Sequence, residues 1–216
     1  MLHPRHLFTT LLLVLFLIPP LPADAEEIKI DGVLDEALWS SAREWTEYFE
    51  SIPFSLAEPK HAQKVLILED EKGMYFGFIN EQPRETIRAN QHQRDNERAN
   101  ADRAGVSIDF DGDGLTAYGF SVSAGGSISD SIYRNENQGN TDWDADWDSA
   151  THIEGDAWFL EMFIPWSIAP MKVQKGDIRK VKLAFWRMVV SEGRVNTSIK
   201  GNPRHCLLYT SPSPRD

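Results

Sequence analysis

Hydrophobic and polar positions alternate along most of the chain with the period of β-strands. The clearest case is 117–123, where small side chains at odd positions alternate with large apolar side chains at even positions. Glycine-containing turns separate such segments: the turn at 69–73 predicts a hairpin, and Asp111–Gly114 is a dense turn signal. We expect strands over 64–68, 74–79, 104–110, 115–123, 127–133, 151–153, 157–164 and 179–190.

Helical periodicity is scarce, being confined to 36–42 and to a turn or two after Pro165. Many short strands joined by glycine-rich turns favour an all-β fold, specifically an antiparallel β-sandwich, over an α/β fold. Two polar segments without an apolar period, 82–102 and 135–142, predict loops. Loops of such length within a compact domain are usually functional or disordered.

The first 25 residues have the pattern of a secretory signal sequence. Leu7–Ile18 is mostly apolar but shorter than the roughly 20 residues that span a bilayer. Ala23–Ala25 fits the small-x-small cleavage pattern. We therefore expect export across the inner membrane and cleavage after Ala25.

The last eleven residues, Cys206–Asp216, resemble the translation of one reading frame of a transposon-type sequencing adapter. We exclude them from fold reasoning as an artefactual tail. The domain is then expected to span 26–205 and to be truncated at its C-terminal end. Because Cys206 is the only cysteine in the chain, this domain would contain no disulfide.

The formal net charge is −11, and both excluded ends are neutral, so the whole charge belongs to 26–205. A domain this acidic is a poor candidate for binding nucleic acid, whose phosphates need a basic surface. The charge also argues against an amphipathic membrane-surface helix, which would carry Lys and Arg.

The start of the domain, 28–39, indicates a strand, a turn and a helical turn in succession. Ile28 and Ile30 alternate with charged residues, and Gly32 supplies a turn conformation that other residues adopt poorly. Asp35 is expected to cap the helical turn. We expect three apolar side chains to face inward and cover one end of a sheet: Leu34, Leu38 and Trp39.

This stretch, with the pattern Ile-Asp-Gly-x-Leu-Asp-Glu-x-x-Trp, resembles the start of family 9 carbohydrate-binding modules. It resembles still more closely the family-9-like domain at the N-terminus of large bacterial envelope proteins. Further short motifs in the same order extend the resemblance from about Ile28 to about Arg187: Asp102, 106–109, 117–122, Gly126, Asp130, 143–147 and 161–167.

The resemblance implies a β-sandwich that binds a saccharide without catalysis and serves carbohydrate breakdown. It also implies a C-terminal outer-membrane β-barrel as the partner in the full-length chain. The location would then be the periplasm or outer membrane of a Gram-negative-type bacterium, or its cell surface.

The segment 141–148 is the densest group of candidate functional residues, since four aspartates alternate with Trp143, Ala145 and Trp147. If it is extended, the carboxylates share one face and both indoles share the other. The functional interpretation is a saccharide site at Trp143, Trp147 and Asp144, with Arg94 and Asp95 from the long loop. In the alternative, both indoles close the core and the carboxylates face water.

Asp109, Asp111 and Asp113 imitate the first half of a calcium-binding loop, with Gly114 as the sixth residue. The twelfth position is Phe120 rather than Glu, so a plain hairpin turn explains the same pattern. Calcium could also bind at the aspartates of 142–146. No transition-metal site is indicated, since the histidines are isolated.

The sequence gives little support for catalysis. It has no Gly-x-Ser-x-Gly elbow, and no pair of carboxyl groups is singled out as acid and base. Any O-glycosyl hydrolase activity would belong to the missing part of the protein, as in an accessory domain of a glycoside hydrolase. One alternative is a periplasmic docking or plug domain without sugar affinity. Another is a sandwich that holds haem, which would need axial His or Met ligands, but Met162 and Met188 are more easily explained as core residues.

Overall fold

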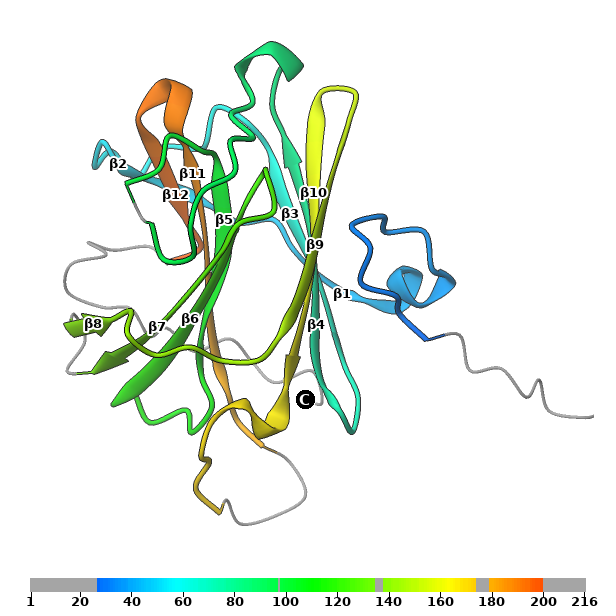
Figure 1. Cartoon of the computed structure of the whole chain (residues 1–216), viewed down its shortest axis with the longest axis vertical. Coiled ribbons are helices and arrows are strands. Elements are labelled where there is room, and N and C mark those ends of the chain that lie inside the picture. The colour runs from blue at the N-terminus through cyan, green and yellow to red at the C-terminus, as the bar shows by residue number, and fades with distance from the viewer. Residues whose placement is uncertain (1–26, 97, 135–137, 174–178, 200–216) are drawn as a thin grey trace, which may run out of the picture.

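The computed structural model describes residues 27–96, 98–134, 138–173 and 179–199. Two antiparallel sheets pack face to face, which confirms the predicted β-sandwich (Figure 1). The predicted signal sequence, 1–25, and the adapter-like tail, 206–216, lie outside the described residues. Among the described residues no helix is long and apolar enough to cross a membrane.

The five-stranded sheet has the order β1-β3-β4-β10-β9. Its strands are β1 (Arg43–Trp45), β3 (Gln63–Glu69), β4 (Gly73–Glu81), β10 (Ala157–Pro165) and β9 (Asp148–Glu154). Strands β3 and β4 form the hairpin predicted from the turn at 69–73. Strands β9 and β10 form a second hairpin that the sequence also predicts.

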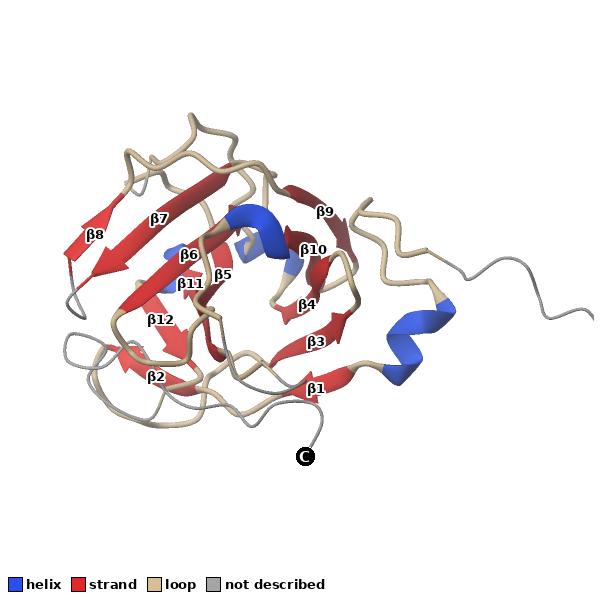
Figure 2. Ribbon diagram, turned by 90° about the horizontal axis from the view of Figure 1, so that it is seen from below, coloured by secondary structure: helices blue, strands red, loops and turns tan. Residues whose placement is uncertain are grey.

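The seven-stranded sheet has the order β2-β12-β11-β5-β6-β7-β8, and Figure 2 shows the two sheets curving toward each other. Its strands are β2 (Phe49–Ile52), β12 (Arg194–Thr197), β11 (Lys182–Val189), β5 (Arg103–Asp109), β6 (Thr116–Ser123), β7 (Ile128–Arg134) and β8 (Gln138–Asn140). The four central strands were predicted. Strands β2, β12 and β8 were not, because segments this short carry no clear apolar alternation.

The main core lies between the sheets, where every second residue of each strand points inward. The ring of Phe185 on β11 contacts Phe76 and Phe78 of the opposite sheet, with centroids 6.0 and 6.1 Å apart. Other fully buried members of this core are Val106, Ile108, Phe120, Val122, Trp158, Leu160 and Met162.

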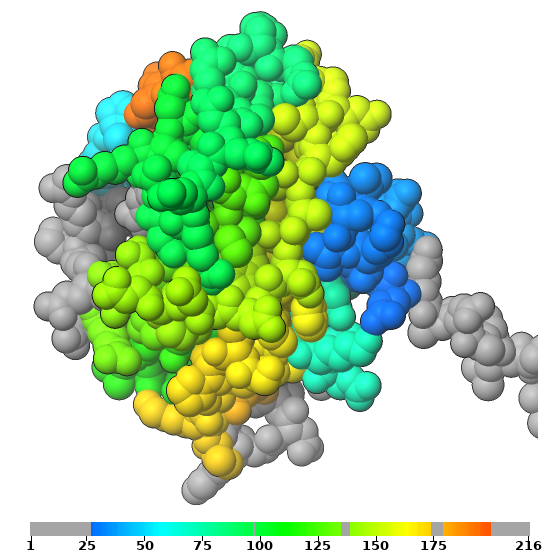
Figure 3. All heavy atoms as spheres, in the orientation of Figure 1, coloured from blue at the N-terminus to red at the C-terminus, as the bar shows by residue number. Residues whose placement is uncertain are grey.

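The N-terminal segment, 27–42, lies against the outward face of the five-stranded sheet, where Figure 3 shows it in blue. It contains the 3-10 helix η1 (Ala37–Ser41). Gly77 on β4 permits this close approach, because a Cβ there would lie 2.6 Å from Leu34 Cδ2. The contact forms a second apolar cluster with the buried members Ile28, Trp39, Leu66 and Tyr75.

Glu161, a buried residue of β10, fastens this segment to the sheet. Its Oε2 accepts hydrogen bonds from the backbone N–H groups of Asp31 (2.9 Å) and Gly32 (2.7 Å). Its Oε1 accepts one from the indole N–H of Trp39 at 3.2 Å. Burial raises the pKa of Glu161 to about 7, although these donors favour the ionised form. The Asp-Gly pair and the Trp of the opening motif therefore meet at one carboxylate.

Three local predictions for this segment are wrong. Residues 28–30 join neither sheet. The residue before η1 is Glu36, whose side chain makes no capping hydrogen bond, so Asp35 is not the cap. Leu38 is 38% exposed rather than inward-facing. The segment is held by Glu161 and by side-chain packing, and these tertiary contacts replace the ladder and capping bonds.

The long polar loop, 82–102, is tied down at its base although its sequence has no apolar period. It contains the short 3-10 helix η2 (Arg84–Thr86). The buried carboxylate of Asp102 accepts hydrogen bonds from Gln82 Nε2 (2.9 Å), Arg88 N (2.9 Å) and Val190 N (2.8 Å).

The described part of the second predicted loop, 135–142, is not only loop, because it contains the strand β8. Two further 3-10 turns are η3 (Trp166–Ile168), predicted after Pro165, and η4 (Val190–Glu192).

Candidate functional site

Asp130, on β7, joins the predicted loop 82–102 to the candidate segment 141–148. Its buried carboxylate accepts hydrogen bonds from Arg94 of the long loop, whose Nη2 lies 2.8 and 2.7 Å from the two oxygens. Its Oδ2 also accepts the N–H of Ala145 at 2.8 Å and the indole N–H of Trp147 at 3.3 Å. Arg94 Nε lies 2.9 Å from Asp144 Oδ1. Sequence-predicted residues from 82–102 and 141–148 are therefore brought together around Asp130.

Residues 141–147 connect β8 to β9 along the side of the sandwich without joining either sheet (Figure 1). Their side chains still alternate, with the aspartates exposed and the two indoles turned toward the core. Trp147 is only 8% exposed and packs on Phe120 with ring centroids 5.4 Å apart. Trp143 is partly buried and packs on Tyr118 at 5.1 Å. The core-closing interpretation therefore describes Trp147, while Trp143 keeps part of its ring accessible.

Asp95, Asp130 and Asp144 offer carboxylate oxygens that all lie within 4.8 Å of one another, a spacing that could hold a metal ion. Burial raises the pKa of Asp95, and the neighbouring Asp130 carboxylate adds to this effect. Arg94 already supplies positive charge to this group, and both Asp130 oxygens accept hydrogen bonds. A cation would therefore compete with Arg94 for these carboxylates.

The carboxylates of Asp109, Asp111 and Asp113 are used within the turn and by nearby cations. Asp109 accepts backbone N–H bonds from Asp111 (3.2 Å), Gly112 (2.9 Å) and Gly114 (2.7 Å). Lys172 Nζ lies 2.6 Å from Asp113 and 3.9 Å from Asp111. The hairpin interpretation explains these contacts without a metal, and calcium at this turn stays a prediction.

A surface that the sequence reasoning missed lies on the outward face of the seven-stranded sheet. Strand register places Trp186, Gly105, Ser121 and Ser129 in one row across β11, β5, β6 and β7. The next row runs through Ala184, Ser107, Gly119 and Ser131. We call the six small residues on β5, β6 and β7 the serine floor: Gly105, Ser107, Gly119, Ser121, Ser129 and Ser131.

Two aromatic side chains border the serine floor. Trp186, half-buried on β11, lies at the end of the first row, and Tyr133 on β7 packs against Gly119. A Cβ at Gly119 would lie 2.8 Å from the Tyr133 ring, so glycine is required for this packing. These rings, Arg103, Met188 and most of the floor line a pocket of about 240 Å³. The Ser129 hydroxyl, at the pocket, has no hydrogen-bond partner among the described residues.

The sequence does carry a signal for this surface. The pairs Gly105/Ser107, Gly119/Ser121 and Ser129/Ser131 each place small residues two positions apart on neighbouring strands. Such spacing puts them on one face of the sheet, and three adjacent strands of this kind form a recess rather than a ridge. Trp186 could not be assigned to the same face without the pairing of β11 with β5.

No family model matches the chain, and no curated protein sequence matches it. Solved structures, however, share its fold. A family 9 carbohydrate-binding module from Caldicellulosiruptor kristjanssonii in complex with glucose has a TM-score of 0.59 at 14% identity and covers 85% of this chain and 90% of its own. A family 9 module from the same organism in complex with cellotriose has a TM-score of 0.57 at 14% identity, with coverages of 88% and 92%.

A Bacteroides uniformis protein for which carbohydrate binding has been proposed has a TM-score of 0.55 at 13% identity and covers 76% of this chain and 85% of its own. At identities this low, the structural likeness establishes the fold and says nothing about the ligand of this chain. The chain has the fold of family 9 carbohydrate-binding modules.

Proposed function

We propose that this chain is a non-catalytic saccharide-binding module and that a sugar ring binds on the serine floor beside Trp186. The observation that carries the proposal is the recess itself: hydroxyl groups form its floor, and half-buried aromatic rings border it. The structural likeness to modules solved with glucose and cellotriose supports the same ligand class.

The chemistry of the recess suits a sugar. Each serine hydroxyl can donate one hydrogen bond and accept two, as can each sugar hydroxyl. The face of an indole offers a flat apolar surface for the C–H groups of a sugar ring. Arg103 adds a cationic donor at one end of the floor. Glu161, whose pKa is raised to about 7, lies in the other sheet and holds the N-terminal segment, so it supplies no acid to this recess.

A second candidate surface is the sequence-predicted set of Trp143, Trp147, Arg94, Asp95 and Asp144. The accessible part of Trp143 favours it, as does the Asp144 side chain, which is 69% exposed. Trp147 would act there through Asp130, because its own ring is buried. Trp143→Ala separates the two surfaces, since it affects this one and leaves the serine floor intact.

Calcium is the cation that an all-oxygen group such as Asp95, Asp130 and Asp144 would take. We propose weak binding at most in the unmodified chain, because Arg94 is already paired with Asp130 and Asp144. The same limit applies at Asp111 and Asp113, which Lys172 contacts.

We further propose that the module is exported and acts in the periplasm or at the outer membrane, joined to a C-terminal β-barrel. The support for this is the signal-like start of the chain and the family resemblance of its motifs. Co-fractionation of the full-length protein with outer membranes tests it. The rival docking-domain function predicts retention of the partner with no saccharide affinity.

Calorimetric titration with glucose and cellotriose tests the binding site. The parent chain is expected to bind, and Trp186→Ala is expected to lose the binding event at the serine floor while remaining folded. Ser129→Ala, which removes one hydroxyl, should weaken binding about tenfold, the worth of one hydrogen bond of roughly 1.4 kcal/mol. Trp166→Phe, far from the floor in the η3 turn, is the control and should bind as the parent does. Equal affinities for the parent and Trp186→Ala would reject this location.

A further inference from the structure

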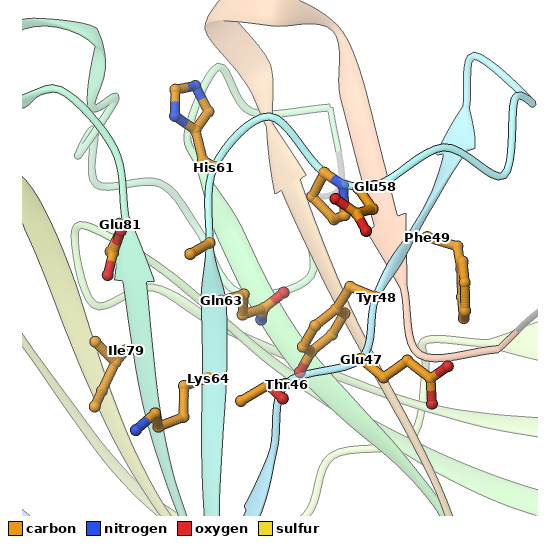
Figure 4. A pocket seen from close by; sticks show the side chains of 12 residues that line it. Thr46, Glu47, Tyr48, Phe49, Glu58, His61, Gln63, Lys64, Ile79 and Glu81 are labelled. Atoms are coloured by element: carbon orange, nitrogen blue, oxygen red, sulfur yellow. The ribbon is translucent and has the colours of Figure 1, made fainter.

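A second recess lies away from the serine floor, where the chain passes from β1 to β2 (Figure 4). It has a volume of about 540 Å³, within the range of small-molecule sites. Residues 46–49 and the start of β3 form its walls. Two of the lining residues, Tyr48 and Gln63, are each only 4% exposed.

Three polar atoms of these two side chains have no hydrogen-bond partner within the part of the chain that the structure describes. They are Tyr48 Oη and both Oε1 and Nε2 of Gln63. Figure 4 shows the Gln63 amide directed from β3 toward the ring of Tyr48. Buried polar atoms in native proteins almost always have a partner in protein, water or ligand. Three such atoms beside one pocket point to a partner that enters through it. Each of these atoms is covered as the chain stands, so the Gln63 and Tyr48 side chains must turn toward the pocket to meet that partner.

The neighbouring backbone does not satisfy the Gln63 amide because its acceptors serve other donors. The guanidinium of Arg187 reaches across from β11 and donates to the carbonyls of Ala62 (3.1 Å) and Glu81 (2.9 Å). Ala62 O also accepts the N–H of Glu81 at 3.0 Å. Burial lowers the pKa of Arg187 to about 10, so it still carries its charge at neutral pH.

The chemistry of this wall selects a neutral ligand that bears hydroxyl groups. The Gln63 amide presents a donor and an acceptor side by side, which matches two adjacent hydroxyls. Burial holds the pKa of Tyr48 well above its ordinary value, so its hydroxyl remains a donor. Glu47, Glu58 and Glu81 are exposed around the same pocket and can accept further hydroxyl hydrogen bonds. The charge of nearby Arg187 disfavours a cation at the inner wall, and the three glutamates around the pocket disfavour an anion, which leaves a neutral ligand.

We propose that this pocket is a second saccharide site that takes one sugar ring, with Gln63 and Tyr48 as its inner hydrogen-bonding wall. The proposal goes beyond binding at the serine floor and does not depend on it.

Nuclear magnetic resonance of the chain, titrated with glucose, tests the pocket separately from the floor. The side-chain amide signal of Gln63 reports on the pocket, and the indole signal of Trp186 reports on the floor. We expect glucose to shift the Gln63 signal in both the parent and Trp186→Ala. Tyr48→Phe should weaken pocket binding about tenfold or more as followed by the Gln63 signal, while the Trp186 response remains. Gln63→Leu should do the same, followed there by the backbone amide signal of Tyr48.

Gln63→Leu should not lower the melting temperature, because it replaces unpartnered buried polar atoms with apolar ones of similar size. A Gln63 signal that does not move at any glucose concentration would overturn the proposal. So would a Gln63→Leu variant that loses several degrees of melting temperature, since fixed internal water would then be the partner. A failure of the floor alone would appear only in the Trp186 signal.

Discussion

The indole of Trp147 packs on Phe120 and donates to the buried carboxylate of Asp130. Trp147→Ala should therefore cost about 3–5 kcal/mol in the free energy of unfolding, as removal of a core aromatic does. Trp143→Ala, at a partly buried position of the same segment, is the matched comparison and should cost less. Chemical denaturation measures both. A cost below about 1 kcal/mol for Trp147→Ala would mean that this ring does not close the core.

Glu161 makes the stability of the protein depend on pH. Its pKa is about 7 in the folded chain, above the ordinary value of 4.5, so the folded state holds a proton that the unfolded state has released. The contribution of Glu161 to the free energy of unfolding is therefore complete below about pH 4.5. It decreases by up to about 3 kcal/mol as the pH rises through 7. Glu161→Gln should remove this part of the pH dependence.

Denaturation of the parent and Glu161→Gln between pH 4.5 and 8 measures the effect as a difference, which cancels the histidines common to both. Parallel stability curves for the two proteins would show that Glu161 does not titrate in this range.

The role of Glu161 was not predictable from sequence. From sequence alone, a glutamate in a strand is predicted to face solvent. Glu161 is buried because the segment 27–42, which is distant in sequence, packs over it.

At the scale of elements, the strands with strong alternation were predictable and the short edge strands were not. Strands β4, β6 and β10 carry enough apolar residues to show their period. Within the described part of the chain, strand β8 pairs only with β7, and its three residues, Gln138–Asn140, contain no apolar side chain. Its existence depends on partner pairing rather than on local pattern, which is why a loop was expected there.

The candidate site divides in the same way. Arg94, Asp95 and Asp144 were expected to cluster, and they do, but the residue that joins them, Asp130, had only the family resemblance to mark it. The serine floor needed the register of four strands before its small residues could be seen as one surface.

Arg94 supplies the charged part of the link between the loop 82–102 and β7, beside two hydrogen bonds made by Asp95. Arg94→Ala removes the charged partner of buried Asp130 and should cost about 2–3 kcal/mol in stability. Three carboxylates then lack that cation, so millimolar calcium should raise the melting temperature of Arg94→Ala more than that of the parent. Thermal unfolding with calcium or chelator checks this, with Arg98→Ala from the same loop as control. An identical calcium response in parent and variant would contradict the role given to Arg94.

At the scale of the whole molecule, the two sheets share one core and use their outward faces differently. The N-terminal segment covers the outward face of the five-stranded sheet and adds an apolar cluster there. The outward face of the seven-stranded sheet instead presents hydroxyls and aromatic rings around a recess. For this reason we place ligand binding on the outward face of the seven-stranded sheet, while the outward face of the five-stranded sheet packs against the N-terminal segment.

The most direct test is a two-dimensional spectrum of the seven tryptophan indole N–H groups during titration with cellotriose. Binding at the serine floor predicts a saturable shift of the Trp186 signal, with the signals of buried Trp147 and Trp158 nearly unmoved. A shift confined to Trp143, or no shift at saturating cellotriose, would contradict binding at the floor.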